Sequence, residues 1–184
     1  MASKYKRTAG YVTEIALAAA LISVCSMISI PFAVPFTMQL FGVYFALFFL
    51  GGRWGCAAVL LYLAIGTVGL PVFSGFAGGV GRLFDSTGGF LWGFLLLSLV
   101  YAVGERALRG FGKKTLIITA LSLLSFYTVG AVWYAAFYAS FSTVSIFATL
   151  SVTVLPFVLP DAIKIYLAYI LAKRLKNIFA KKTG

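Results

Sequence analysis

Charged residues are scarce in this chain, and histidine is absent. Only 10% of the 184 residues are charged, whereas 62% are apolar and 17% are aromatic. A typical soluble domain carries about 25% charged residues, so the composition excludes a water-soluble fold. Without histidine the chain lacks the commonest general base and metal ligand. Because it also has only four acidic residues, we expect no enzymatic activity, no metal and no cofactor.

The chain also has little room for anything outside a membrane. Six membrane-spanning helices would use about 120 residues, and 62% of the chain is apolar. An appended ATPase or nucleic-acid-binding domain is therefore excluded by length, and residues 1–184 are predicted to form one domain. Cys25 and Cys56 lie in apolar runs without a paired spacing, which favours inert buried thiols over a disulfide.

The apolar runs predict an all-α integral membrane protein with a bundle of six transmembrane helices. Short basic tails are expected at about residues 1–10 and 173–184. A glycine-rich segment at residues 71–88 separates the third span from the fourth. The six spans are predicted at residues 11–30, 36–50, 54–70, 89–104, 115–139, and from some point after residue 145 to about residue 171.

The positions of the cations predict the orientation of these spans. Lys and Arg concentrate in cytoplasmic segments close to span ends. If the N-terminus is cytoplasmic, thirteen of the fifteen cations lie on the cytoplasmic side, Arg82 lies outside, and Lys164 lies within a span. We therefore expect a multi-pass protein of the cell membrane with both termini in the cytoplasm. The net charge of +11 is assigned to the lipid bilayer rather than to nucleic acid.

Glycine is concentrated in one part of the chain. Nine of the nineteen glycines lie in residues 66–93, where they allow positive φ and close approach of the backbone. The segment is predicted to be an external loop that folds back into the bundle over a binding site. Non-helical backbone at that depth requires surrounding protein or a water-filled cavity. The alternative is a mobile external loop with solvated Arg82 and Asp85.

Asp161 and Lys164 are the only ionisable pair within an apolar span. A charge near the bilayer centre costs about 3 kcal/mol on insertion scales, so such residues normally face the bundle interior. At a spacing of three they share one helix face. They line a site if Asp161 accepts N–H donors and Lys164 meets an anion; alternatively they form a structural pair. Pro160 predicts a helix start or a kink just before them.

The first span carries a small-residue spacing, with Ala16 and Ala20 one helical turn apart. Small residues at this spacing allow a second helix to approach closely. Because alanine is common in membrane helices, the spacing alone does not identify a partner.

Several motifs together resemble those of the BioY family, the biotin-specific substrate-binding subunits of energy-coupling factor (ECF) vitamin transporters. The resemblance covers most of the chain, but Asp85-Ser86 stands where the family pattern has Gly-Pro. The matching motifs are residues 34–39 (VPFTMQ), 69–73 (GLPVF), 78–81 (GGVG), 87–94 (TGGFLWGF) and 159–164 (LPDAIK).

The resemblance implies a six-helix subunit that captures biotin from outside with high affinity. It implies as partners a membrane-spanning coupling subunit and two cytosolic ATPases, which pass biotin inward. It also implies that Ala16 and Ala20 form the face that docks the coupling subunit.

The resemblance also suggests which residues bind the ligand. Gln39 and Asp161 would bind the ureido group, Phe73 and Phe90 would form an apolar wall for the thiophane ring, and Lys164 and Arg82 would meet the carboxylate. Thr37 and Gly79 belong to the matching motifs and are included among the substrate-binding residues.

Two other functions remain open on sequence grounds. One is a self-sufficient secondary transporter or channel for a small anionic metabolite or another vitamin, which would need a coupling ion and a through-path. The other is an intramembrane enzyme acting on lipid. That enzyme would need an activated nucleophile, and the serines and threonines of this chain have no histidine partner.

Overall fold

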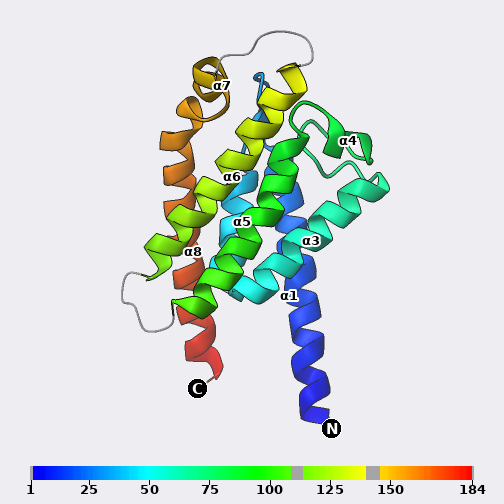
Figure 1. Ribbon diagram of the computed structural model, residues 1–184. Coiled ribbons are helices and arrows are strands. Elements are labelled where there is room, and N and C mark those ends of the chain that lie inside the picture. The colour runs from blue at the N-terminus through cyan, green and yellow to red at the C-terminus, as the bar shows by residue number, and fades with distance from the viewer. Residues whose placement is uncertain (1, 109–113, 140–145, 184) are drawn as a thin grey trace.

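The computed structural model describes residues 2–108, 114–139 and 146–183, and these form mostly helices (Figure 1). The N-terminus and the C-terminus lie at the same end of the bundle. In chain order the elements are α1 (Ala2–Met27), β1 (Ser29–Ile30), β2 (Phe36–Thr37), α2 (Gln39–Leu50), α3 (Gly52–Val68), α4 (Gly81–Phe84), α5 (Gly88–Ala107), α6 (Lys114–Ala139), α7 (Ile146–Thr153) and α8 (Leu155–Thr183).

The described helices include four segments long and apolar enough to cross a membrane. Two shorter apolar helices, α2 and α3, accompany them. The chain is therefore a multi-pass, mainly α-helical membrane protein. The four long segments are Gly10–Met27, Gly88–Ala107, Lys114–Ala139 and Phe147–Phe179.

The N-terminal helix differs from the predicted span at both ends. It begins at Ala2 and ends at Met27, so residues 2–10 continue the helix instead of forming a separate tail. Ser29 and Ile30 then pair antiparallel with Thr37 and Phe36. Helix α1 does not continue into this ribbon because Pro31 and Pro35 have no backbone N–H to donate to a helical hydrogen bond. The resulting ribbon places Phe36 and Thr37 beside the start of α2.

The C-terminal segment also differs from the prediction. A turn at Val154 separates α7 from α8, and Pro160 lies inside α8 instead of starting it. Pro156 lies in the first turn of α8, where a missing N–H leaves no helical hydrogen bond unmade. The helix then continues to Thr183, so the predicted basic tail from residue 173 is helical through the described residues.

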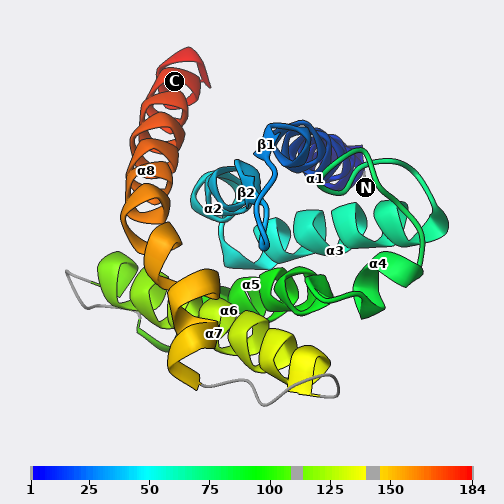
Figure 2. The same ribbon diagram turned by 90° about the horizontal axis from the view of Figure 1, so that it is seen from above.

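Glycine lets α5 and α6 approach each other closely. Seen from above, α5 lies between α3 and α6 (Figure 2). A Cβ added at Gly89 would lie 2.1 Å from Cβ of Trp133, and one added at Gly130 would lie 2.2 Å from the Phe90 ring. Small residues at such contacts are the usual means of close helix packing in membranes.

We expect Gly89→Ala to destabilise the protein because the added methyl group would overlap Trp133. Overpacking of this kind typically costs about 1–3 kcal/mol. Thermal unfolding of the purified protein in detergent measures the change. Gly10→Ala is the matched control, since nothing lies within 4 Å of a Cβ at that position. Equal unfolding temperatures for the two variants would contradict the close packing of α5 on α6.

Candidate functional site

One cavity collects most of the predicted ligand-binding residues. It is lined by β2, the beginnings of α2 and α5, the glycine-rich segment, and residues of α6, α7 and α8. The centre of a water molecule can occupy about 70 Å³ of it. Of the predicted residues, the cavity is lined by Thr37, Gln39, Phe73, Arg82, Phe90, Asp161 and Lys164.

The predicted ion pair forms at this cavity. Nζ of Lys164 lies 2.8 Å from Oδ1 of Asp161, and each side chain is only 6% exposed. The hydroxyl of Tyr127 donates to Oδ2 of Asp161 at 2.7 Å. Both carboxylate oxygens are thus engaged, which offsets part of the cost of burying the charge. The contact with Tyr127 joins α8 to α6.

The Lys164 ammonium has a second partner in the ribbon. Its Nζ lies 3.7 Å from the ring centroid of Phe36, within the range of a cation–π interaction. The Phe36 ring in turn stacks on Phe157 of α8. An ammonium has three N–H donors, so the single hydrogen bond to Asp161 leaves donors for an anionic group in the cavity.

An amide lies at another part of the cavity wall. The Gln39 side chain is 95% buried, and its Nε2 donates to the hydroxyl of Tyr62 at 2.6 Å. The Thr37 hydroxyl donates to Oε1 of Gln39 at 2.9 Å. Both Thr37 and Gln39 line the cavity, whereas Tyr62 does not. This cluster offers hydrogen-bonding groups to a neutral polar part of a ligand.

The glycine-rich segment packs against the bundle through Phe73. This side chain is 1% exposed and lies edge-on to Tyr62 at 5.5 Å between ring centroids. The ring fits there because Gly66 has no side chain: a Cβ at that position would lie 2.2 Å from the ring. Gly79 adopts φ +96° and donates its N–H to the carbonyl of Gly66 at 2.7 Å. Gly79 therefore fastens the segment to α3 and does not line the cavity.

Arg82 brings a second cation to the cavity. Its Nη1 lies 2.6 Å from Oδ2 of Asp85, and its buried Nε has no hydrogen-bond partner within the described part of the chain. Asp85 also accepts hydrogen bonds from the N–H and hydroxyl of Thr87 at the start of α5. The two charged side chains are 35% and 28% exposed, so they are paired with each other and only partly solvated.

The remaining wall is aromatic. The rings of Phe94 and Phe126 stack at 4.7 Å, and Phe90 lies 5.5 Å from Phe126. All three rings line the cavity. Flat apolar surface beside two cations and a set of hydrogen-bonding groups suits a small ligand with an apolar ring and an anionic group. No cluster of three or more potential metal ligands occurs in the described residues.

Sequence reasoning missed two residues of this site. Tyr127 is not among the residues predicted for the site, yet it bonds to Asp161. Phe36 belonged to a recognised motif, but its contact with Lys164 was not foreseen. Both contacts join residues far apart in sequence, and no local pattern specifies which helix faces meet. The hydroxyl of Tyr127 is one of several in α6, so nothing in the sequence singles it out.

The predicted small-residue face lies open on α1. Ala16 and Ala20 are exposed, together with Leu17 and Val24, which are 66% and 56% exposed. Ala18 and Ala19 instead face the core. The described residues therefore leave the face that carries Ala16 and Ala20 free for another helix.

A family model and the sequences of known proteins point to the same family. The model of the BioY family matches residues 1–181. A probable biotin transporter BioY of Pyrococcus horikoshii is 35% identical over 90% of this chain and 96% of its own length. The biotin transporter BioY of Thermotoga maritima is 38% identical over 86% of this chain and 91% of its own length.

A solved structure shares the fold. The crystal structure of the S-component for biotin from an ECF-type ABC transporter superposes with a TM-score of 0.81. It covers 94% of this chain and 93% of its own, at 24% sequence identity.

We expect Lys164→Ala to lower the free energy of unfolding by about 3–5 kcal/mol, because it leaves the Asp161 carboxylate buried without its cation. Adding Asp161→Asn should restore more than half of the loss, since a neutral amide is cheaper to bury. Thermal unfolding in detergent measures both effects. Lys173→Ala, which removes an exposed cation of the same helix, is the control. A double variant no more stable than Lys164→Ala would show that the loss has another cause.

Proposed function

The chain belongs to the BioY family, and on that premise we propose that it is the biotin-binding subunit of an ECF transporter. It captures biotin from outside the cell with high affinity and performs no chemistry on it. The observation that carries the proposal is the cavity, where the Asp161–Lys164 pair lies beside aromatic and amide side chains.

The groups of biotin match those of the cavity. Its carboxylate needs a cation, its ureido group needs hydrogen-bond donors and acceptors, and its thiophane ring needs apolar contacts.

We assign the carboxylate to Lys164, with Arg82 as a second cation. Lys164 retains free N–H donors, and the buried Nε of Arg82 has no partner in the described residues. Thr37, Gln39 and Asp161 are assigned to the ureido group. Phe73 and Phe90 are assigned to the thiophane ring, and Gly79 shapes the segment that carries Phe73.

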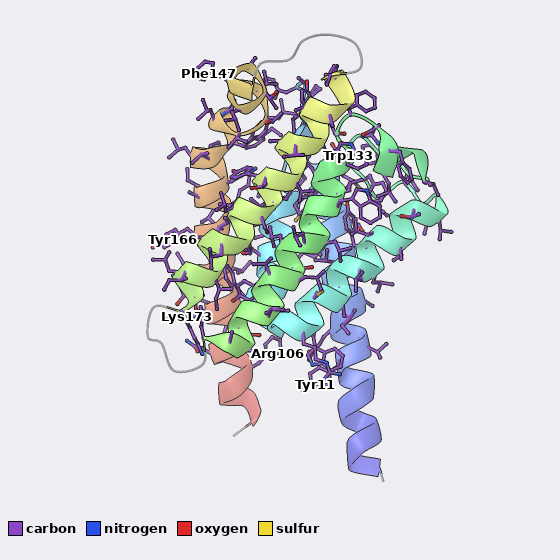
Figure 3. All side chains as sticks on the ribbon, viewed as in Figure 1. Tyr11, Arg106, Trp133, Phe147, Tyr166 and Lys173 are labelled. Atoms are coloured by element: carbon purple, nitrogen blue, oxygen red, sulfur yellow. The ribbon has the colours of Figure 1, made fainter. Side chains whose placement is uncertain are left out.

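In the membrane we assign six spans to α1, α2, α3, α5, α6 and the pair α7–α8, with both termini cytoplasmic. Tyr11, Arg106 and Lys173 lie toward the end of the bundle that carries the termini, whereas Trp133 and Phe147 lie toward the other end (Figure 3). Aromatic and basic side chains favour membrane–water interfaces. The glycine-rich segment would then lie on the outer side, over the cavity.

Energy for uptake is assigned to other chains. A coupling subunit would pack on the open face of Ala16 and Ala20, and two cytosolic ATPases would drive it. The sequence of this chain has no match to the phosphate-binding loop pattern. Biotin uptake by vesicles that lack every ATPase would instead favour a self-sufficient secondary transporter.

We expect Lys164→Ala to weaken biotin binding because it leaves the ligand carboxylate buried without a cation. The cost is about 2–5 kcal/mol, or roughly 30-fold to several thousand-fold in affinity. Calorimetry with biotin and with its uncharged amide tests the assignment. Wild type and Lys173→Ala should prefer the acid, and Lys164→Ala should lose that preference. If the preference survives in Lys164→Ala, Lys164 is not the carboxylate partner and Arg82→Ala becomes the variant to measure.

We expect Ala16→Trp combined with Ala20→Trp to abolish ATP-driven uptake, because the bulky rings prevent close helix approach. Binding of biotin to the purified subunit should persist. Leu124→Trp, at an exposed position of α6, is the control and should leave uptake unchanged. Loss of binding together with uptake in a folded double variant would place the alanine face in the binding site or the fold instead.

A further inference from the structure

An apolar groove lies between α5 and α6, apart from the proposed biotin cavity. No residue lines both the groove and that cavity. The two helices come close at Gly104, where an added Cβ would lie 3.1 Å from the Ile118 side chain. Every residue that lines the groove is apolar, and besides Gly104 and Ile118 they include Leu96, Leu99, Val103 and Leu121.

The groove opens on the surface that faces the bilayer. Leu99, Val103 and Leu121 are 44%, 65% and 52% exposed. They belong to α5 and α6, which are both long and apolar enough to cross a membrane. Side chains exposed along such helices meet hydrocarbon instead of water. A lipid acyl chain is therefore the occupant that suits an entirely apolar groove at this place.

Two cations extend the walls of the groove. Arg106 comes three residues after Val103 on α5, and Lys114 comes four residues before Ile118 on α6. Residues at these spacings share one face of a helix. Helix α5 ends at Ala107 and α6 begins at Lys114, so both cations lie at the same end of the groove. Figure 3 shows Arg106 toward the end of the bundle that carries the termini.

The chain does not supply an anion for these two cations. Among the described residues the ion pairs are the two already named, and neither contains Arg106 or Lys114. Glu105 is next to Arg106 in sequence, but its Oε2 accepts the N–H of Gly52 at the start of α3, at 2.7 Å. Arg106 is exposed. An anionic group from outside the chain can therefore reach both cations.

We propose that the groove, together with Arg106 and Lys114, binds one anionic phospholipid. One acyl chain lies in the groove, and the phosphate lies between the two cations. Basic sites between transmembrane helices on the cytoplasmic side bind anionic headgroups, and anionic lipids are abundant in that leaflet. The proposed orientation of the spans places Arg106 and Lys114 on that side. A zwitterionic headgroup adds a positive group beside its phosphate and should bind more weakly.

The test is a lipid titration of the purified full chain in detergent, followed by native mass spectrometry. Phosphatidylglycerol is compared with phosphatidylcholine that has the same acyl chains. Each Lys or Arg near an anionic headgroup contributes about fivefold in affinity. Wild type should therefore prefer phosphatidylglycerol at least about tenfold. In Arg106→Gln combined with Lys114→Gln the preference should shrink to within about threefold.

Arg174→Gln combined with Lys176→Gln is the matched control. It removes the same charge from two exposed positions of α8 near the C-terminus, which lies at the same end of the bundle (Figure 1). This control should keep the full preference for phosphatidylglycerol. An equal loss of preference in both double variants would overturn the site, because the preference would then come from net charge alone.

The groove itself is tested with Val103→Trp, which places a ring where the acyl chain would lie. We expect it to weaken phosphatidylglycerol binding at least about fivefold, since the chain loses apolar contact. Leu124→Trp, at a position of α6 that is 62% exposed and does not line the groove, should bind as wild type does. Unchanged binding in Val103→Trp would overturn the placement of the acyl chain.

The outcomes are independent of the proposed function. Neither Arg106 nor Lys114 lines the proposed biotin cavity, so their double variant should bind biotin as wild type does, which also shows that it is folded. Wild type without a preference for phosphatidylglycerol, or a double variant that keeps the preference, would overturn the lipid site and leave biotin binding standing. Wild type that does not bind biotin would overturn the proposed function alone.

Discussion

The buried pair of Asp161 and Lys164 is the interaction on which the site depends. Two charges in an apolar bundle are tolerated only when their hydrogen-bonding groups find partners. Asp161 finds one in Tyr127 of α6, and Lys164 lies against the Phe36 ring of the ribbon. The need to satisfy one ion pair therefore brings α6, α8 and the segment before α2 to the same cavity.

The need to give buried polar groups a partner also explains the rest of the cavity wall. Gln39 is paired through Thr37 and Tyr62, and Arg82 is paired with Asp85. The missing side chain at Gly66 leaves room for the Phe73 ring of the glycine-rich segment to pack on α3. Polar groups are thus held in fixed orientations inside an apolar shell, which is the arrangement expected of a pre-formed small-molecule site.

Hydropathy predicted most of the helices, because long apolar runs have few alternatives to helix in a membrane. The residues at which the helices begin and end were less predictable. Residues 2–10 continue α1 although they are polar and basic, and Pro160 lies within α8 because the helix had already started at Leu155. Asp161 and Lys164 could be selected from sequence since charge in an apolar run is rare. Tyr127 and Tyr62 could not, because their importance comes only from contacts between distant helices.

The central claim is that this cavity holds biotin, and native mass spectrometry of the protein purified from biotin-replete cells tests it most directly. The account predicts one bound molecule with the mass of biotin per chain, released when the protein unfolds. A chain that carries a different small molecule, or that stays empty when biotin is added in excess, would contradict it.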